Sequence, residues 1–127
     1  MSDIGIIETD HAPAAVGTYS QGVIYNNFCF FSGQIGIDPI TNKLELDFDS
    51  QLSQILKNID AMLKSQRLER SDILKTTIFL TDLSQFSKVN QAYQNYFDKP
   101  YPARSCVEVS KLPKDALVEI EVFARKP

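Results

Sequence analysis

The sequence predicts a single α/β domain, in which one mixed sheet carries two helices on one face. Two segments, residues 50–66 and 82–97, place apolar residues at the three- and four-residue steps of an amphipathic helix. The segments around them are short, rich in β-branched and aromatic residues, and bounded by turn residues, as strands are. The resulting order, β-β-β-α-β-α-β-β, fills residues 1–127 without a linker or an internal repeat.

The composition indicates one compact domain and argues against nucleic-acid and membrane partners. The 127 residues, of which 43% are hydrophobic, suit one compact domain. The 13 Lys and Arg residues against 16 Asp and Glu give a net charge of -3, and no basic run stands out. We therefore do not expect a nucleic-acid partner. No apolar stretch is long enough to cross a bilayer, so we do not expect a membrane partner either.

Two features favour the cytoplasm. The two cysteines, Cys29 and Cys106, do not make a disulfide framework and suit a reducing compartment. The first basic residue is Lys43, and acidic residues come before it. That charge pattern argues against a secretory signal and against an Arg-rich transit peptide. We therefore expect a cytoplasmic protein.

The N-terminal region predicts a strand and a loop. Residues 4–9 are a short apolar run, expected to form an edge strand. Residues 11–21 are rich in small residues, proline and glycine, which is typical of a loop. His11 is the only histidine, and without partners at metal-ligand spacing it is interpreted as a loop residue. Tyr19 could stack on a ligand or simply pack the loop.

Residues 22–37 are expected to form a hairpin. Its turn is Asn26-Asn27, because asparagine tolerates the positive φ that a tight turn requires. The returning strand, Phe28–Phe31, is apolar at four consecutive positions, which indicates burial on both faces of the sheet. Gly33 follows and marks either a bulge or a close approach of the backbone to a ligand. Residues 38–42 are expected to form a turn.

Residues 50–66 predict the first helix, with Asp49 or Ser50 as its N-cap. One-sided amphipathic helices normally cover a sheet, so we interpret its apolar stripe as core rather than as a binding surface. The stripe consists of Leu52, Ile55, Leu56, Ile59, Met62 and Leu63.

The second helix is predicted to begin at Asp82, with Gln85 three residues later as in a capping box. Two prolines, Pro100 and Pro102, close it. Asn90 lies beside the apolar stripe, and its residue type alone indicates a surface position. The stripe consists of Phe86, Val89, Tyr93, Tyr96 and Phe97.

The remaining strands are predicted at Ile73–Leu80, 102–109 and 118–122. Two helices can cover only one face of the sheet, yet Phe28–Phe31 and residues 78–80 are apolar on both faces. No remaining segment can cover the second face. We therefore predict a homo-oligomer, whose mass in solution is a multiple of 14.3 kDa.

The last two predicted strands carry charges inside an apolar pattern. Arg104 and Cys106 share one face of the first, and Glu119 and Glu121 share one face of the second. A planar guanidinium near a carboxylate can bind a small carboxylic acid and direct water chemistry on it. The alternative is a structural ion pair between Arg104 and Glu119 on a solvated face. If the two strands are neighbours, a shared face requires Cys106 opposite Glu119, and a shift of one residue would separate the two charges.

Several motifs with their internal spacing intact extend over nearly the whole chain. The first group is Tyr19-Ser20-Gln21, Phe31-Ser32-Gly33-Gln34, Lys75-Thr76-Thr77, Phe79-Leu80-Thr81-Asp82 and Val89-Asn90. The second group is Pro102-Ala103-Arg104-Ser105, Leu112-Pro113-Lys114 and Val118-Glu119-Ile120-Glu121. With these motifs the sequence resembles the RidA family, the YjgF-like reactive-intermediate deaminases. A signature of this length is a strong signal, unlike any single short motif.

The resemblance implies a chorismate-mutase-like fold and a homotrimer, in which three sheets form a central barrel and a ligand cleft lies at each subunit interface. It also implies hydrolysis of 2-imino and enamine acids, such as 2-iminobutanoate and 2-iminopropanoate, to 2-oxo acids and ammonia. Pyridoxal-phosphate enzymes acting on threonine and serine produce these intermediates. Neither a metal nor an organic cofactor is implied.

Site residues carry over by position from the same resemblance. Arg104 matches the arginine that binds the substrate carboxylate, and its fork suits two charge-assisted hydrogen bonds. Glu119 matches the cleft glutamate, to which we assign positioning or deprotonation of the attacking water. Cys106 matches a position whose backbone carbonyl faces the ligand, and we do not expect it to act as a nucleophile. The remaining cleft positions, some supplied by the neighbouring subunit, are Tyr19, Ser32, Gly33 and Asn90.

Two other classes of function stay open. The first is a non-catalytic, metabolite-binding regulatory trimer, because family membership alone does not establish turnover. The presence of both Arg104 and Glu119 argues against it. The second is a nucleic-acid or chaperone role, and the acidic balance argues against nucleic acid.

Overall fold

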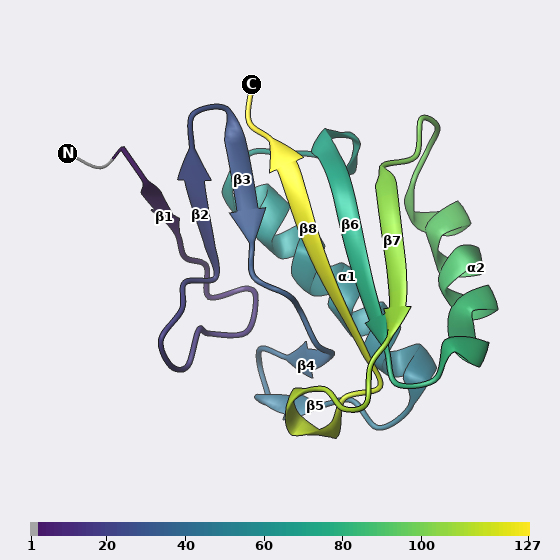
Figure 1. Cartoon of the computed structure of the whole chain (residues 1–127). Helices are drawn as coiled ribbons and strands as arrows, with labels where there is room; N and C mark the ends of the chain where they lie inside the picture. The colour runs from purple at the N-terminus through teal and green to yellow at the C-terminus, as the bar shows by residue number, and fades with distance from the viewer. Residues whose placement is uncertain (1–2) are drawn as a thin grey trace.

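The computed structural model describes residues 3–127, and Figure 1 shows one sheet backed by helices. The six strands lie in the order β1-β2-β3-β8-β6-β7. Strands β6 and β7 run parallel, whereas the other neighbouring strands are antiparallel, so the sheet is mixed as predicted. The strands are β1 (Gly5–Ile7), β2 (Gly22–Tyr25), β3 (Phe28–Phe31), β6 (Ile73–Leu80), β7 (Ala103–Glu108) and β8 (Val118–Arg125).

The helices α1 (Phe48–Ser65) and α2 (Phe86–Tyr96) cover the same face of this sheet, so the predicted order of main elements is confirmed (Figure 1). The predicted turn at residues 38–42 connects two unpredicted strands, β4 (Ile37–Asp38) and β5 (Lys43–Leu44), which pair as a separate small sheet. Strands of two residues are too short to show the alternation that identifies a strand. Three short 3-10 helices complete the fold: η1 (Arg70–Asp72), η2 (Leu83–Gln85) and η3 (Pro113–Asp115).

The predicted helix caps are partly wrong. The N-cap of α1 is Asp47, whose carboxylate accepts from the Ser50 amide at 2.8 Å, while the Ser50 hydroxyl accepts from the Asp47 amide at 3.3 Å. Asp49 and Ser50 therefore lie inside the first turn, because Ser50 acts as the third residue of a capping box. Asp82 does act as a cap, but it caps η2, and α2 begins only at Phe86.

The last two strands are not neighbours, because β6 lies between β7 and β8. Thr76 on β6 stands opposite Arg104 on β7, and Phe79 stands opposite Glu119 on β8. Positions 76 and 79 alternate to opposite faces of β6. Arg104 therefore lies on the face that carries the helices, and Glu119 lies on the uncovered face. The condition for a shared face is not met, and the structural ion pair between these two residues is excluded within one chain.

The core lies between the helices and the face of the sheet that they cover. Strand residues such as Ile78 and Ile120 are at most 1% exposed and pack with Ile55 and Ile59 of α1 in one buried cluster. Burying side chains of this size stabilises the fold by roughly 1.5–3 kcal/mol each. In the part of the chain that the structure describes, neither helix combines the length and hydropathy that a bilayer crossing needs.

The other face of the sheet is uncovered and carries several large apolar side chains beside charged ones. Within Phe28–Phe31 only Cys29 and Phe31 are buried, and the expectation of burial on both faces is therefore not met in a single chain. Phe28 is 46% exposed, Phe30 is 38% exposed and Val107 on β7 is 44% exposed. Large apolar side chains gathered on one uncovered face mark an interaction surface.

Candidate functional site

Six of the seven predicted site residues line one of two cavities, and Cys106 lines neither. The first cavity, of about 700 Å³, is bordered by the N-terminal loop, the segment after β3, η3 and the start of β8. Tyr19, Ser32, Gly33 and Glu119 all line it. The second cavity, of about 500 Å³, lies between α2 and β7, and Arg104 and Asn90 line it.

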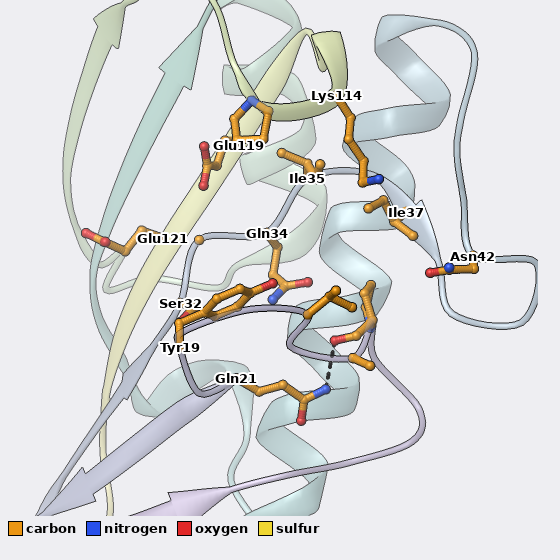
Figure 2. A pocket seen from close by; sticks show the side chains of 15 residues that line it. Tyr19, Gln21, Ser32, Gln34, Ile35, Ile37, Asn42, Lys114, Glu119 and Glu121 are labelled. Atoms are coloured by element: carbon orange, nitrogen blue, oxygen red, sulfur yellow. Dashed lines mark hydrogen bonds between the residues drawn. The ribbon is translucent and has the colours of Figure 1, made fainter.

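The first cavity has an acidic side and a side on which Lys114 lies among apolar residues. Figure 2 shows Glu119 and Glu121 extending from β8 near Tyr19, while the Lys114 side chain lies across the cavity beside Ile37. Sequence reasoning did not assign Lys114 to a site, although the Pro113-Lys114-Asp115 turn is the signal for it. Lys114 has a φ of 57° and Asp115 has the same value, which is uncommon for residues other than glycine.

The loop that carries Tyr19 is tied to the sheet by two polar side chains. The Ser32 hydroxyl donates to the Ser20 carbonyl at 2.6 Å. The buried Gln21 amide accepts from the Thr9 amide at 2.7 Å and donates to the Pro13 carbonyl at 2.8 Å. Because the Ser32 proton is engaged in the loop, the oxygen of this hydroxyl remains available to a ligand only as an acceptor. Sequence reasoning gave Gln21 no separate role.

Gly33 lies against the carboxylate of Glu119. A Cβ added at Gly33 would lie 3.0 Å from Glu119 Cδ and closer still to Oε2. Gly33 therefore makes a close approach to the catalytic candidate Glu119, whereas the predicted approach of its backbone to a ligand stays a prediction. Burial raises the pKa of Glu119, and the nearby Glu121 carboxylate raises it further. A carboxylate with a raised pKa is a better proton acceptor than an ordinary surface glutamate.

In the second cavity, Arg104 is held against α2. Its Nη1 donates to Asn90 Oδ1 at 2.7 Å, and its Cζ lies 4.9 Å from the centre of the Phe86 ring. Asn90 is half-buried rather than a free surface residue. Asn90 takes one donor of the guanidinium, and Arg104 lines the cavity, where two of its other donors can serve a carboxylate.

Cys106 is half-buried on the same face of β7 as Arg104 and packs against the core. Burial raises the pKa of its thiol, while the nearby Arg104 lowers it by a smaller amount. A thiol with a raised pKa holds its proton at neutral pH and is a poor nucleophile. Its backbone role toward a ligand stays a prediction.

One chain does not bring Arg104 and Glu119 together. They lie on opposite faces of the sheet, and their partners on β6 are three residues apart, which is about 10 Å along the strand. Within residues 3–127, no group of three or more His, Cys, Asp or Glu side chains is arranged to hold a metal ion, and His11 lies in an exposed loop.

Comparisons with known proteins agree on one family. A family model described as endoribonuclease L-PSP matches residues 9–126. The 2-iminobutanoate/2-iminopropanoate deaminase of Escherichia coli K12 is 45% identical over 93% of this chain and 94% of its own length. A conserved Rid family protein of unknown function, YyfA from Yersinia pestis, superposes with a TM-score of 0.93 at 50% identity, covering 96% of this chain and 98% of its own. E. coli TdcF, crystallised with bound serine, gives a TM-score of 0.91 at 42% identity, covering 97% and 99% of the two chains.

Proposed function

The chain belongs to the endoribonuclease L-PSP family, which includes the RidA-type relatives, and we propose that it is a hydrolytic deaminase of reactive 2-imino acids. Its substrates are 2-iminobutanoate and 2-iminopropanoate, together with their enamine forms, and its products are 2-oxo acids and ammonia. The observation that carries this proposal is the pair of cavities, one with an arginine held in place by Asn90 and the other with a half-buried carboxylate.

The complete site forms where two copies of the chain meet. A homotrimer with a central barrel covers the uncovered apolar face of each sheet, and it brings the second cavity of one copy against the first cavity of the next. The proposal is supported by the exposed apolar residues of that face and by β7, an edge strand on which only Cys106 is partly shielded. Separation of Arg104 from Glu119 within one chain also supports it, since neither half alone holds both groups.

The residues divide the work between binding and proton transfer. Arg104 holds the substrate carboxylate by two charge-assisted hydrogen bonds, and Asn90 occupies one of its other donors. Tyr19, Ser32 and Gly33 shape the opposite wall, where the Ser32 oxygen accepts from the protonated imine nitrogen. The backbone of Cys106 borders the same cleft.

Glu119 directs the water. It accepts a proton as the water oxygen attacks the imine carbon, which gives a tetrahedral carbinolamine. Glu119 then gives this proton to the nitrogen, the C–N bond breaks, and ammonia leaves as the C=O bond forms and Glu119 takes up the proton of the carbinolamine hydroxyl. An imine whose nitrogen is protonated is already a good electrophile, so positioning the water removes the main remaining cost. The scheme uses no metal or organic cofactor and suits the cytoplasm, where such imines arise.

A direct assay tests this function. A threonine dehydratase generates 2-iminobutanoate in the cuvette, and its decay is followed with and without the protein. Faster decay in proportion to protein concentration is expected. A rate equal to the spontaneous one would contradict the proposal and favour the metabolite-binding alternative, which saturation binding of 2-oxobutanoate would then support.

RNA cleavage is the other activity that the family description raises. Glu119 and Glu121 border the first cavity and would repel a phosphate backbone. The single histidine, His11, lines neither cavity. The same preparation is therefore expected to leave a single-stranded RNA intact during the imine assay.

The contact between Gly33 and Glu119 gives a mutational prediction. Gly33→Ala pushes the Glu119 carboxylate out of place, because the flexible end of that side chain moves more easily than the backbone. Deaminase turnover is expected to fall roughly 10- to 100-fold, the cost of a small misplacement, while the melting temperature stays near that of the wild type.

Gly36→Ala is the matched control. Its added Cβ would lie 2.6 Å from Gln51 Cα in α1, where the backbone cannot yield. That variant should lose stability instead. Full turnover in Gly33→Ala, or a loss of stability equal to that of Gly36→Ala, would show that Gly33 does not act through Glu119.

A further inference from the structure

Three residues of helix α2 form the binding surface for the Arg104 side chain, here called the cradle. Phe86, Asn90 and Tyr93 follow at steps of four and three residues, so they lie on one face of the helix. The Asn90 amide oxygen accepts a hydrogen bond from Arg104, and two aromatic rings flank its guanidinium. The Arg104 Cζ lies 4.9 Å from the Phe86 centroid and 5.3 Å from the Tyr93 centroid.

Tyr93 is anchored beneath this cradle by its hydroxyl. The side chain is buried, and its hydroxyl donates to Thr76 Oγ1 at 2.7 Å. Thr76 stands directly opposite Arg104 across β6 and β7, and both residues point to the face that carries the helices. The hydrogen bond therefore pins the Tyr93 ring at the same row of the sheet from which the Arg104 side chain extends.

The hydroxyl keeps its donor role at working pH. Burial raises the pKa of Tyr93 to about 12, although the Thr76 hydrogen bond and the Arg104 charge act to lower it. The Phe97 ring packs against the edge of Tyr93 with 5.1 Å between centroids, which further restricts the ring.

We propose that the Tyr93–Thr76 hydrogen bond fixes the plane of the Arg104 guanidinium, which makes Tyr93 and Thr76 positioning residues for binding of the substrate carboxylate. This inference rests on the proposed function for its substrate. Two parallel N–H···O bonds form only when the guanidinium and the carboxylate share a plane. The rings of Phe86 and Tyr93 on α2 set that plane, and the buried hydrogen bond to Thr76 holds the Tyr93 ring.

Tyr93→Phe and Thr76→Val test the proposal, because each keeps the packing close to that of the wild type and removes the bond. In either variant, the KM for 2-iminobutanoate is expected to rise roughly three- to tenfold, the worth of one intramolecular hydrogen bond. The kcat is expected to stay within about twofold, because Arg104 holds the same carboxylate before and during the reaction. The double variant should show no further rise, since both changes remove one bond, and Thr76→Ser should restore the KM.

Tyr96→Phe is the matched control. Tyr96 lies on the same helix, is similarly buried, and donates its hydroxyl to Asp60 Oδ1 at 2.5 Å, away from Arg104. It should lose stability and keep the wild-type KM. An unchanged KM in Tyr93→Phe, or an equal rise in Tyr96→Phe, would overturn the proposal.

A second readout does not depend on turnover. ¹⁵N relaxation of the Arg104 Nε–H group should show a lower order parameter in Tyr93→Phe than in the wild type, and no change in Tyr96→Phe. If the wild type fails to accelerate imine decay, the proposed deaminase function is refuted. The order parameter still decides the positioning role in that case, and equal values in the wild type and Tyr93→Phe would refute it.

Discussion

Arg104→Ala is expected to lower kcat/KM for 2-iminobutanoate by roughly 100- to 1,000-fold, which brings decay close to the spontaneous rate. The loss is large because the substrate carboxylate would enter the cleft without a partner for its charge. Steady-state decay of enzymatically generated 2-iminobutanoate measures it. Arg104→Lys should fall in between, since an ammonium keeps the charge but cannot make the planar pair of hydrogen bonds.

Arg70→Ala is the matched control for Arg104→Ala. Arg70 also stacks on a tyrosine of α2, with its Cζ 3.9 Å from the Tyr96 centroid, and it pairs with Asp60 at 2.8 Å. It lines neither of the two cavities. This variant should lose stability and keep its turnover. Equal kcat/KM values for Arg104→Ala and the wild type would remove Arg104 from the mechanism.

Glu119→Gln is expected to lower kcat roughly 100- to 10,000-fold, because the amide keeps the shape of the side chain but cannot accept the proton of the attacking water. Its stability at neutral pH should equal or exceed that of the wild type. The folded-state pKa of Glu119 is raised, so the fold favours the protonated form, and its contribution to stability is lost as pH rises through that pKa. The neutral amide avoids that loss. A stable Glu119→Gln variant with wild-type kcat would contradict the role.

The same shift in pKa predicts how the rate depends on pH. Glu119 must be ionised to accept a proton, so kcat/KM should fall as pH decreases through its pKa, at a higher pH than for an ordinary glutamate. Glu121 raises that pKa by repulsion, and therefore Glu121→Gln should move this acid limb to lower pH. An unmoved limb would show that another group controls it.

Local sequence patterns predicted most of the fold. The helical stripes, the strand at Ile73–Leu80 and the Asn26 turn, with its φ of 54°, are each set by residues close together in the chain. The caps of α1 were misplaced because serine serves either as a cap or as the third residue of a capping box. Side-chain type alone does not separate these two positions.

The pairing of strands that are distant in the chain could not be predicted from the sequence. The spacing of Arg104 and Cys106 places them on one face, but which strand lies beside β7 depends on tertiary contacts. The insertion of β6 between β7 and β8 put Arg104 and Glu119 on opposite faces. The hydrogen bond of the Tyr93 hydroxyl could not be predicted for a similar reason. Helical spacing identifies Tyr93 as a core residue, but its hydrogen bond to Thr76 joins positions 17 residues apart.

Mixing two inactive variants tests most directly whether the site is shared between chains. Arg104→Ala and Glu119→Gln chains, unfolded together in equal amounts and refolded, would form mixed trimers. If each cleft takes Arg104 from one chain and Glu119 from the next, about a quarter of the clefts hold both native groups, and about a quarter of wild-type activity returns. The control mixture of Arg104→Ala with the Arg104→Ala/Glu119→Gln double variant should stay inactive. No recovery in the first mixture, from trimers shown to be mixed by mass, would mean that both groups act from one chain.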